Sequence, residues 1–134
     1  MKNTYHIKVR WGDTDAATIV YYPNFYKWMD EATHEFFEAA GYSTPALQKN
    51  YKIQLPLLEA ACTFKAPLKH NDKVQVITFI EEINRKVLRL RHEFIKGNSV
   101  IANGYEKRAW TTVEKDQMKA VPVPDFIKEA LTTQ

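Results

Sequence analysis

A long apolar helix near the N-terminus limits what the rest of this chain can build. Apolar residues recur at helical spacing over residues 24–40, and charged residues lie mostly opposite them. The predicted stripe consists of Phe25, Trp28, Met29, Ala32, Phe36 and Ala39. Pro23 suits the start of this helix, and Gly41 suits its C-terminal cap. A helix with so wide a stripe needs a second layer of structure to cover it.

The remaining segments are typical of strands joined by short polar turns. Tyr5, Ile7, Val9 and Trp11 alternate with polar residues, which predicts a half-buried strand that ends at Gly12. Further strands are predicted at residues 55–64, 73–81, 87–95 and 99–113, and short helices at 43–50 and 125–131. Consecutive strands with short connections favour an antiparallel sheet. We therefore expect one α+β domain over residues 1–134, with a sheet curled around the central helix.

Composition excludes several classes of protein. The net charge of +3 suits an anionic small ligand but falls short of a nucleic-acid-binding face. Cys62 is the only cysteine, so an intrachain disulfide is excluded, and its apolar strand predicts a buried core thiol. No run of about 18 apolar residues predicts membrane insertion, and the first residues lack the apolar stretch of a signal peptide. The expected location is cytoplasmic.

Two carboxylates lie in the loop between the first strand and the long helix. Asp13 and Asp15 precede the helix start, where unpaired backbone N–H groups can hold a developing oxyanion. A carboxylate there can attack a carbonyl or activate water, which would make a hydrolytic site. The alternative is that both residues serve only as turn and capping residues. The four histidines have no metal-like spacing, so no metal site is expected.

The loop closely resembles the signature of the 4-hydroxybenzoyl-CoA thioesterase family of hot-dog-fold proteins. That signature is an aromatic residue, Gly-Asp-x-Asp-x-x-Gly, an apolar pair, and Tyr-Pro-Asn leading into a long helix. The matching positions are Gly12, Asp13, Asp15, Tyr22, Pro23 and Asn24. Residues 28–32 continue the match, and residues 81–86 stand where the family places a basic turn. The resemblance implies a hot-dog fold, with about five antiparallel strands wrapped around the helix.

The resemblance also implies roles for individual residues. Asp15 would be the catalytic carboxylate, as nucleophile or as general base, and the backbone N–H of Tyr22 would polarise the thioester carbonyl. Asp13 would organise the loop. Arg85 and Lys86 would meet the phosphates of coenzyme A, where cations suit the negative charge. The alternative for these two cations is an ordinary solvated hairpin.

The implied reaction is hydrolysis of an acyl-CoA or aroyl-CoA thioester to a free acid and coenzyme A, without a metal or bound cofactor. Asp30 would touch the acyl group, unless it is a plain helix-surface acid. The site would lie between subunits of a homodimer or homotetramer, and an acyl-carrier protein is a further candidate donor. Two other functions stay open: a dehydratase or hydratase using His34, and a non-catalytic acyl-CoA or acyl-carrier-protein binding protein.

The sequence departs from the family pattern at two positions. Thr18 replaces the usual Gly, where a side chain would narrow the approach to the site or clash with a positive φ. Asn84 stands where a third cation can occur, which would weaken coenzyme A binding.

Overall fold

The computed structural model describes residues 1–133, so residue 134 of the predicted domain lies outside it. The α-helices of this part of the chain are α1 (Pro23–Ala39), α2 (Thr44–Tyr51) and α3 (Asp125–Thr132), and a short 3₁₀ helix lies at Trp11–Asp13. The strands are β1 (Lys2–Lys8), β2 (Ile53–Gln54), β3 (Leu57–Phe64), β4 (Lys73–Asn84), β5 (Val87–Lys96), β6 (Ser99–Ala109), β7 (Thr111–Glu114) and β8 (Gln117–Ala120).

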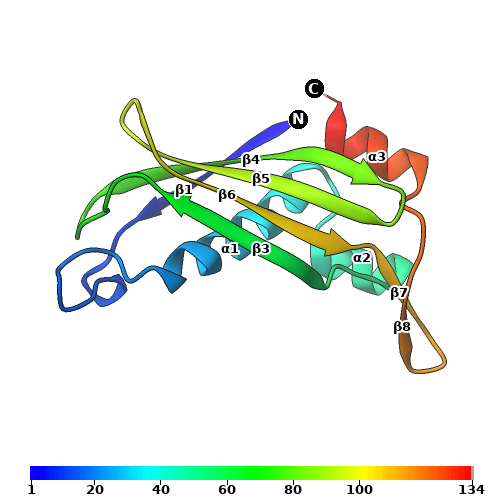
Figure 1. Ribbon diagram of the computed structural model, residues 1–134. Helices are drawn as coiled ribbons and strands as arrows, with labels where there is room; N and C mark the ends of the chain where they lie inside the picture. The colour runs from blue at the N-terminus through cyan, green and yellow to red at the C-terminus, as the bar shows by residue number, and fades with distance from the viewer. Residues whose placement is uncertain (134) are drawn as a thin grey trace.

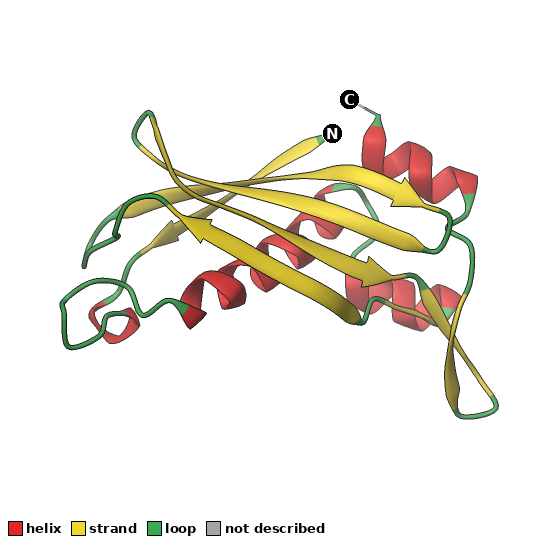
Figure 2. Ribbon diagram, in the orientation of Figure 1, coloured by secondary structure: helices red, strands yellow, loops and turns green. Residues whose placement is uncertain are grey.

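Five strands form one antiparallel sheet, and α1 runs along one of its faces. The strand order is β1-β4-β5-β6-β3, which leaves β1 and β3 at the edges. Figure 1 shows the sheet bending over α1, and Figure 2 shows that α2 and α3 lie towards the far end of α1. The predicted α+β fold, a sheet of five strands around a central helix, is confirmed. Among residues 1–133, no helix has the length and apolar character needed to cross a membrane.

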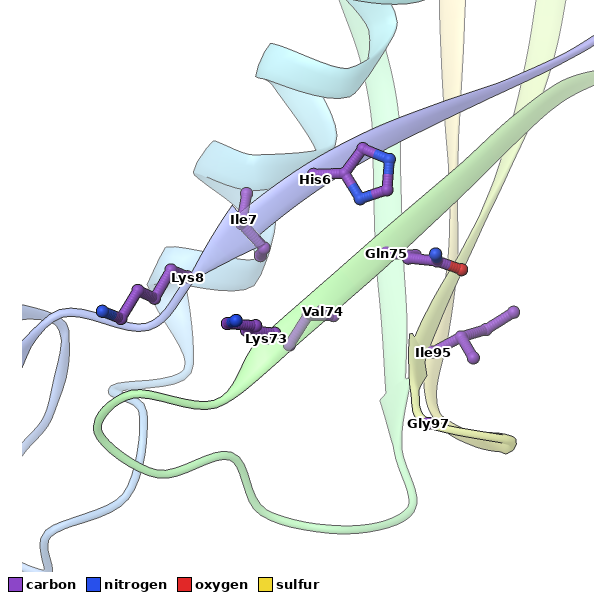
Figure 3. Close-up of a pocket in the computed structure, with 8 residues that line it drawn as sticks. All are labelled: His6, Ile7, Lys8, Lys73, Val74, Gln75, Ile95 and Gly97. Atoms are coloured by element: carbon purple, nitrogen blue, oxygen red, sulfur yellow. The ribbon is translucent and has the colours of Figure 1, made fainter.

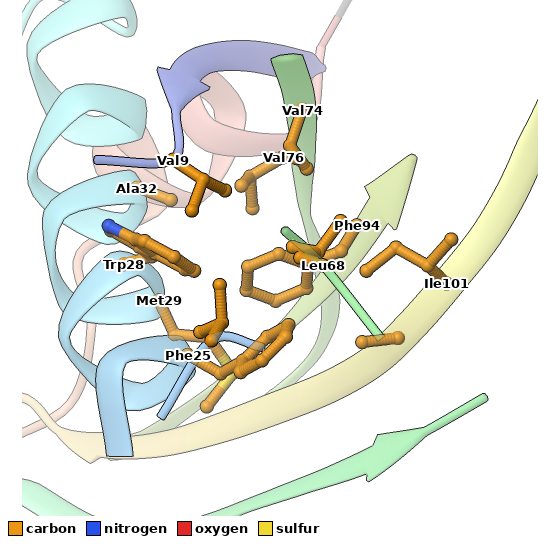
Figure 4. Packing of buried hydrophobic residues seen from close by; sticks show 12 residues of the cluster. Val9, Phe25, Trp28, Met29, Ala32, Leu68, Val74, Val76, Phe94 and Ile101 are labelled. Carbon is orange, nitrogen blue, oxygen red and sulfur yellow. The ribbon is translucent and has the colours of Figure 1, made fainter. Parts of the chain in front are cut away.

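The apolar stripe of α1 packs into two clusters of buried residues. One surrounds Phe25, Trp28 and Met29 and fills the space between the helix start and the sheet (Figure 4). The other gathers around Phe36 and Phe37 near the helix end. The predicted stripe was wrong at one position, because Ala39 is exposed. Near the end of the helix Phe37 is buried instead, and it packs with residues of α2, α3 and β5.

Gly104 of β6 allows α1 to approach the sheet closely. A Cβ atom built there would lie 2.5 Å from Met29 Sδ and 2.8 Å from the carbonyl oxygen of Ala61. Both distances are shorter than van der Waals contact, so a side chain at this position would displace the end of Met29 and press on the β3 backbone. The glycine therefore makes room for Met29 of α1 against the sheet.

The first strand differs from its predicted bounds. β1 spans Lys2–Lys8 rather than residues 5–11, and it pairs along its whole length with β4. The alternation stops at Val9, which is fully buried, and Trp11 enters the 3₁₀ helix with its side chain exposed. The reason is the loop that follows, which turns the chain away from the sheet towards the start of α1.

The predicted strand at residues 99–113 is interrupted at Trp110. This side chain is buried, and its backbone N–H donates to the carbonyl of Lys86, so the chain leaves the main sheet there. The chain continues as the β7–β8 hairpin, which forms a small second sheet with β2 and projects from the body (Figure 1). This hairpin was not predicted because its two turn residues, Lys115 and Asp116, adopt positive φ without the glycine that usually marks such a turn.

Candidate active site in the loop before the long helix

Asp13 ties the loop to the start of α1. Its side-chain Oδ2 accepts the backbone N–H of Arg10 at 2.8 Å. Its backbone carbonyl accepts two further hydrogen bonds, from the N–H of Tyr21 at 2.8 Å and from the Nδ2 of Asn24 at 2.9 Å. These contacts are those expected of a residue that organises the loop, although the role itself stays a prediction.

Asp15 stands at the head of a tight turn within this loop. Its backbone N–H donates to the carbonyl of Ile19, and its carbonyl accepts the N–H of Thr18, both at 2.9 Å. Its Oδ1 accepts the N–H of Ala17 at 2.8 Å, which fixes the side-chain rotamer. The carboxylate is exposed in the single chain, and its Oδ2 has no hydrogen-bond donor among residues 1–133. One oxygen is thus held in place while the other is free to react.

The start of α1 presents one unused backbone donor. Tyr22 is the N-cap, and Pro23 has no N–H to offer. The N–H groups of Asn24 and Phe25 are occupied by the carbonyls of Tyr21 and Tyr22. Within residues 1–133 the N–H of Tyr22 has no acceptor, so it is the donor of the first turn that a ligand oxygen can use. The Tyr22 ring is itself 60% exposed.

An apolar hollow of about 420 Å³ opens beside this donor. It is lined by Ile19, Val20, Tyr22 and Phe25 and by residues 64–68. The Phe25 and Phe64 rings meet edge to face, with centroids 4.9 Å apart. Ligand pockets commonly have volumes of about 300–1,000 Å³ and mostly apolar walls. The hollow therefore suits a small apolar or aromatic group next to the Tyr22 N–H.

Thr18 adopts φ +65°, a left-handed conformation that β-branched residues disfavour. Of the two effects considered for the missing glycine, a strained backbone is the one that the structure shows. We expect Thr18→Gly to raise the free energy of unfolding by about 1 kcal/mol and Tm by roughly 4 °C. Thermal melts at fixed protein concentration test this, with Ala16→Gly as the control. An unchanged or lower Tm in Thr18→Gly would contradict the strain.

Asp30 lies two turns further along α1 and is held by a buried ion-pair network. Its Oδ1 accepts the Arg108 guanidinium at 2.7 Å, although the Asp30 side chain is 52% exposed. Arg108 is 6% exposed and also binds Glu106 at 3.0 Å and the carbonyl of Leu55 at 3.0 Å. The network thus fixes a carboxylate at the surface from within the core. It lies about 12 Å along the helix from Tyr22.

Glu106 is the buried centre of this network. It accepts hydrogen bonds from Thr33 and Arg108, and His92 Nε2 lies 3.5 Å from its Oε1. Burial alone would raise the pKa of Glu106, but hydrogen bonds with His92 and Arg108 outweigh it and lower the pKa from 4.5 to about 2. For Arg108, burial acts to lower the pKa, but the contacts with Glu106 and Asp30 outweigh it and raise the pKa above its usual value. Both groups are therefore charged at neutral pH.

His34 joins Asp30 on the surface of α1. Its Nε2 lies 3.4 Å from Asp30 Oδ1, and its Nδ1 lies 2.8 Å from the hydroxyl of Thr44. A hydratase would need a histidine beside an acid, and the structure does place His34 beside Asp30. The pair is on the helix surface rather than at the Asp15 loop, and its carboxylate is shared with Arg108.

Arg85 and Lys86 form the turn between β4 and β5, far from Asp15 of the same chain. The turn is anchored because its two carbonyls accept the N–H groups of Val123 and Trp110 at 2.9 and 2.8 Å. β4 carries the chain about 36 Å from the Asp15 end of the sheet to this turn. Within one chain, the predicted coenzyme A residues and the predicted catalytic residue are therefore not brought together.

Two further features do not belong to this site. Cys62 is only half-buried, so the prediction of a buried thiol was too strong, but burial still raises its pKa to about 11 and keeps it protonated. A hollow of about 490 Å³ lies on β1, β4 and the end of β5, with His6, Lys73 and Gln75 among its lining residues (Figure 3). No predicted site residue lines it.

Sequence reasoning missed the Glu106–Arg108 pair. The two residues stand at alternate positions of β6, so they share the face that packs against α1. A Glu and an Arg on an inward-facing, otherwise apolar strand face is a signal of a buried ion pair. The partners that complete it, Thr33 and His92, lie 73 and 14 residues away from Glu106, and no local pattern connects them to it.

The chain is similar to proteins of known family. A family model described as the thioesterase-like superfamily matches residues 9–131. The 4-hydroxybenzoyl-CoA thioesterase of Pseudomonas sp. strain CBS-3 is 25% identical over 130 residues, which cover 90% of this chain and 92% of the relative. A 1,4-dihydroxy-2-naphthoyl-CoA hydrolase of Nostoc punctiforme is 26% identical over 133 residues, covering 99% and 88%.

Solved structures agree with this relationship. The structure of a gentisyl-coenzyme A thioesterase is 46% identical, covers 96% of this chain and 98% of its own, and has a TM-score of 0.83. The Pseudomonas 4-hydroxybenzoyl-CoA thioesterase structure, at 24% identity and a TM-score of 0.88, shows the shared fold. The resemblance stated from the Asp13–Asn24 signature is thereby confirmed, and the chain belongs to the thioesterase-like superfamily of hot-dog-fold proteins.

Proposed function

We propose that this protein hydrolyses aroyl-CoA thioesters at the loop that carries Asp15. The observation that carries the proposal is the placement of the Asp15 carboxylate, held by the Ala17 N–H, and the unused N–H of Tyr22 on one hydrogen-bonded loop. Its relatives named above are thioesterases or hydrolases of 4-hydroxybenzoyl-CoA, 1,4-dihydroxy-2-naphthoyl-CoA and gentisyl-CoA. All three acyl groups are hydroxylated aromatic rings, which supports an aromatic substrate here.

The reaction follows from the chemistry of these groups. The Tyr22 N–H, with the positive end of the α1 dipole behind it, stabilises the oxyanion that forms at the thioester carbonyl. Asp15 either attacks the carbonyl and forms an anhydride that water opens, or takes a proton from the attacking water. On both routes the C–S bond breaks, the thiolate of coenzyme A leaves, and water supplies the new oxygen of the acid. Neither route uses a metal or a bound cofactor.

A site shared by two subunits is part of the proposal. β3 is an edge strand that runs between the two parts of the proposed site. At one end, Phe64 contacts Phe25 beside the Tyr22 donor, and at the other end Leu58 lies near the Arg85–Lys86 turn. If two copies of β3 pair antiparallel about a two-fold axis, the Phe64 end of one meets the Leu58 end of the other. Such pairing brings Asp15 of one chain towards the basic turn of its partner. It also covers the exposed edge.

Asp30 is the group that we propose to contact the acyl ring. Its carboxylate is exposed and held by Arg108, so it can accept a hydrogen bond from a ring hydroxyl at low entropic cost. Because Asp30 lies about 12 Å from its own Tyr22, the ring it contacts would belong to a substrate held by the partner. We propose the cytoplasm as the location, since a lone thiol such as Cys62 is common in a reducing compartment.

Thiol release from a panel of thioesters tests the function. The panel contains gentisyl-, 4-hydroxybenzoyl-, benzoyl-, hexanoyl- and palmitoyl-CoA, with crotonyl-CoA monitored for hydration and one acyl-carrier-protein thioester as alternative donor. We expect kcat/KM for the hydroxylated aroyl substrates to exceed that for the aliphatic ones by at least tenfold, with no loss in EDTA. Absence of thiol release from every member, despite binding of coenzyme A, would favour a non-catalytic binding protein instead.

A further inference from the structure

Four charged residues form a row across the outer face of the sheet, opposite α1. The strand register aligns Glu82 with Arg89, Arg89 with Lys107, and Lys107 with Glu59. The two cations are therefore direct neighbours on β5 and β6. Like charges placed opposite each other on a sheet destabilise it unless an opposite charge lies between or beside them.

A hollow of about 270 Å³ adjoins this pair. Both cations line it, together with Leu58, Asn84 and Glu82. The hollow thus reaches from the edge strand β3 to the last residue of β4, immediately before the Arg85–Lys86 turn. Asn84, which stands where the family pattern can have a third cation, is one of its lining residues.

Arg89 is held in position but its donors are not all used. Its guanidinium lies over the Tyr105 ring at 3.9 Å, and its Nε approaches Glu81 Oε1 to 2.6 Å. That nitrogen is buried against Glu81, whereas the two terminal nitrogens of the guanidinium make no hydrogen bond within residues 1–133. A fixed guanidinium with unused donors is suited to an incoming anion.

Lys107 is also only loosely paired. Its Nζ lies 3.7 Å from Glu59 Oε2, beyond ordinary hydrogen-bond length. That same Glu59 oxygen accepts the Tyr105 hydroxyl at 2.6 Å, which lowers the pKa of Glu59 and occupies the carboxylate. The lysine can therefore turn towards a ligand in the hollow without breaking a strong contact.

We propose that Arg89 and Lys107 bind the 3′-phosphate monoester of coenzyme A in this hollow. A phosphate monoester carries about −1.5 to −2 charges at neutral pH, which suits two adjacent cations better than one phosphate of a diphosphate does. The proposal rests on coenzyme A as the carrier in the proposed function. The two residues supply the charge that Asn84 lacks, and they leave Arg85 and Lys86 for the diphosphate.

Calorimetric titration of the whole protein with coenzyme A, dephospho-CoA and pantetheine tests the assignment. We expect Arg89→Gln and Lys107→Gln each to weaken coenzyme A binding by about fivefold to tenfold and dephospho-CoA binding by less than twofold. Glu82→Gln should tighten coenzyme A binding, because it removes a negative charge from the rim. Lys119→Gln, a charge change on the distant β8, is the control, and melting curves establish that each variant is folded.

The outcomes separate this inference from the proposed function. Equal losses for coenzyme A and dephospho-CoA, or no loss for either, would overturn the assignment even in an active thioesterase. Selective loss for coenzyme A supports the assignment even if the protein hydrolyses nothing, because the titration needs no turnover. In an active enzyme, each of the two variants should raise KM for acyl-CoA by about fivefold to tenfold, with kcat and the kinetics on acyl-pantetheine unchanged.

Discussion

Asp15→Asn should lower kcat for the best aroyl-CoA substrate by at least about a hundredfold, or about 2.7 kcal/mol of barrier. The amide keeps the shape of the carboxylate, and its oxygen can still accept the Ala17 N–H that holds the side chain. It cannot act as a carboxylate nucleophile or as a strong base. KM should change little because the loop, the Tyr22 N–H and the adjoining apolar hollow remain as they were.

The matched control is Asp116→Asn. This substitution makes the same chemical change in the β7–β8 turn, where residue 116 has a positive φ that asparagine tolerates. Its kcat should equal that of the parent protein. If Asp15→Asn retained the parent's kcat, Asp15 would have no part in the chemistry, and another group would have to activate water.

Glu106→Gln should lower the free energy of unfolding at pH 7 by about 3 kcal/mol. The substitution leaves Arg108 buried with only the half-exposed Asp30 to balance its charge. Breaking one side of a buried ion pair commonly costs about 3–5 kcal/mol, because the remaining charge is no longer compensated. Urea unfolding at fixed protein concentration measures the change. Glu114→Gln is the control, since its pair with Lys119 is exposed and contributes little.

The same residue predicts how stability depends on pH. The folded-state pKa of Glu106 is about 2 against 4.5 for the free group, so folding favours the ionised form. Its contribution is complete above pH 4.5 and is lost as the pH falls towards 2. The difference between the parent protein and Glu106→Gln should therefore shrink from about 3 kcal/mol at pH 7 towards zero near pH 2. A difference that stays constant with pH would show that Glu106 acts by packing alone.

Local sequence patterns determined the architecture because they reflect local physics. The α1 stripe, Pro23 and Gly41 describe one helix, since its hydrogen bonds join residues four apart. Alternation in β4 and β5 located both strands, since side chains in a strand repeat every two residues. The loop signature was recognisable for the same reason. The hydrogen bonds of Asp13, Asp15 and Tyr22 join residues that are at most eleven positions apart in the sequence.

Tertiary structure decided what depends on contacts between distant segments. The break at Trp110 arises because its N–H donates to the carbonyl of Lys86 in the β4–β5 turn. The position of the Asp30 carboxylate is fixed by a hydrogen bond from Arg108, 78 residues away. The register that places Arg89 beside Lys107 depends on two strands pairing across a turn. Local sequence patterns do not determine such partners, because only the folded chain brings them together.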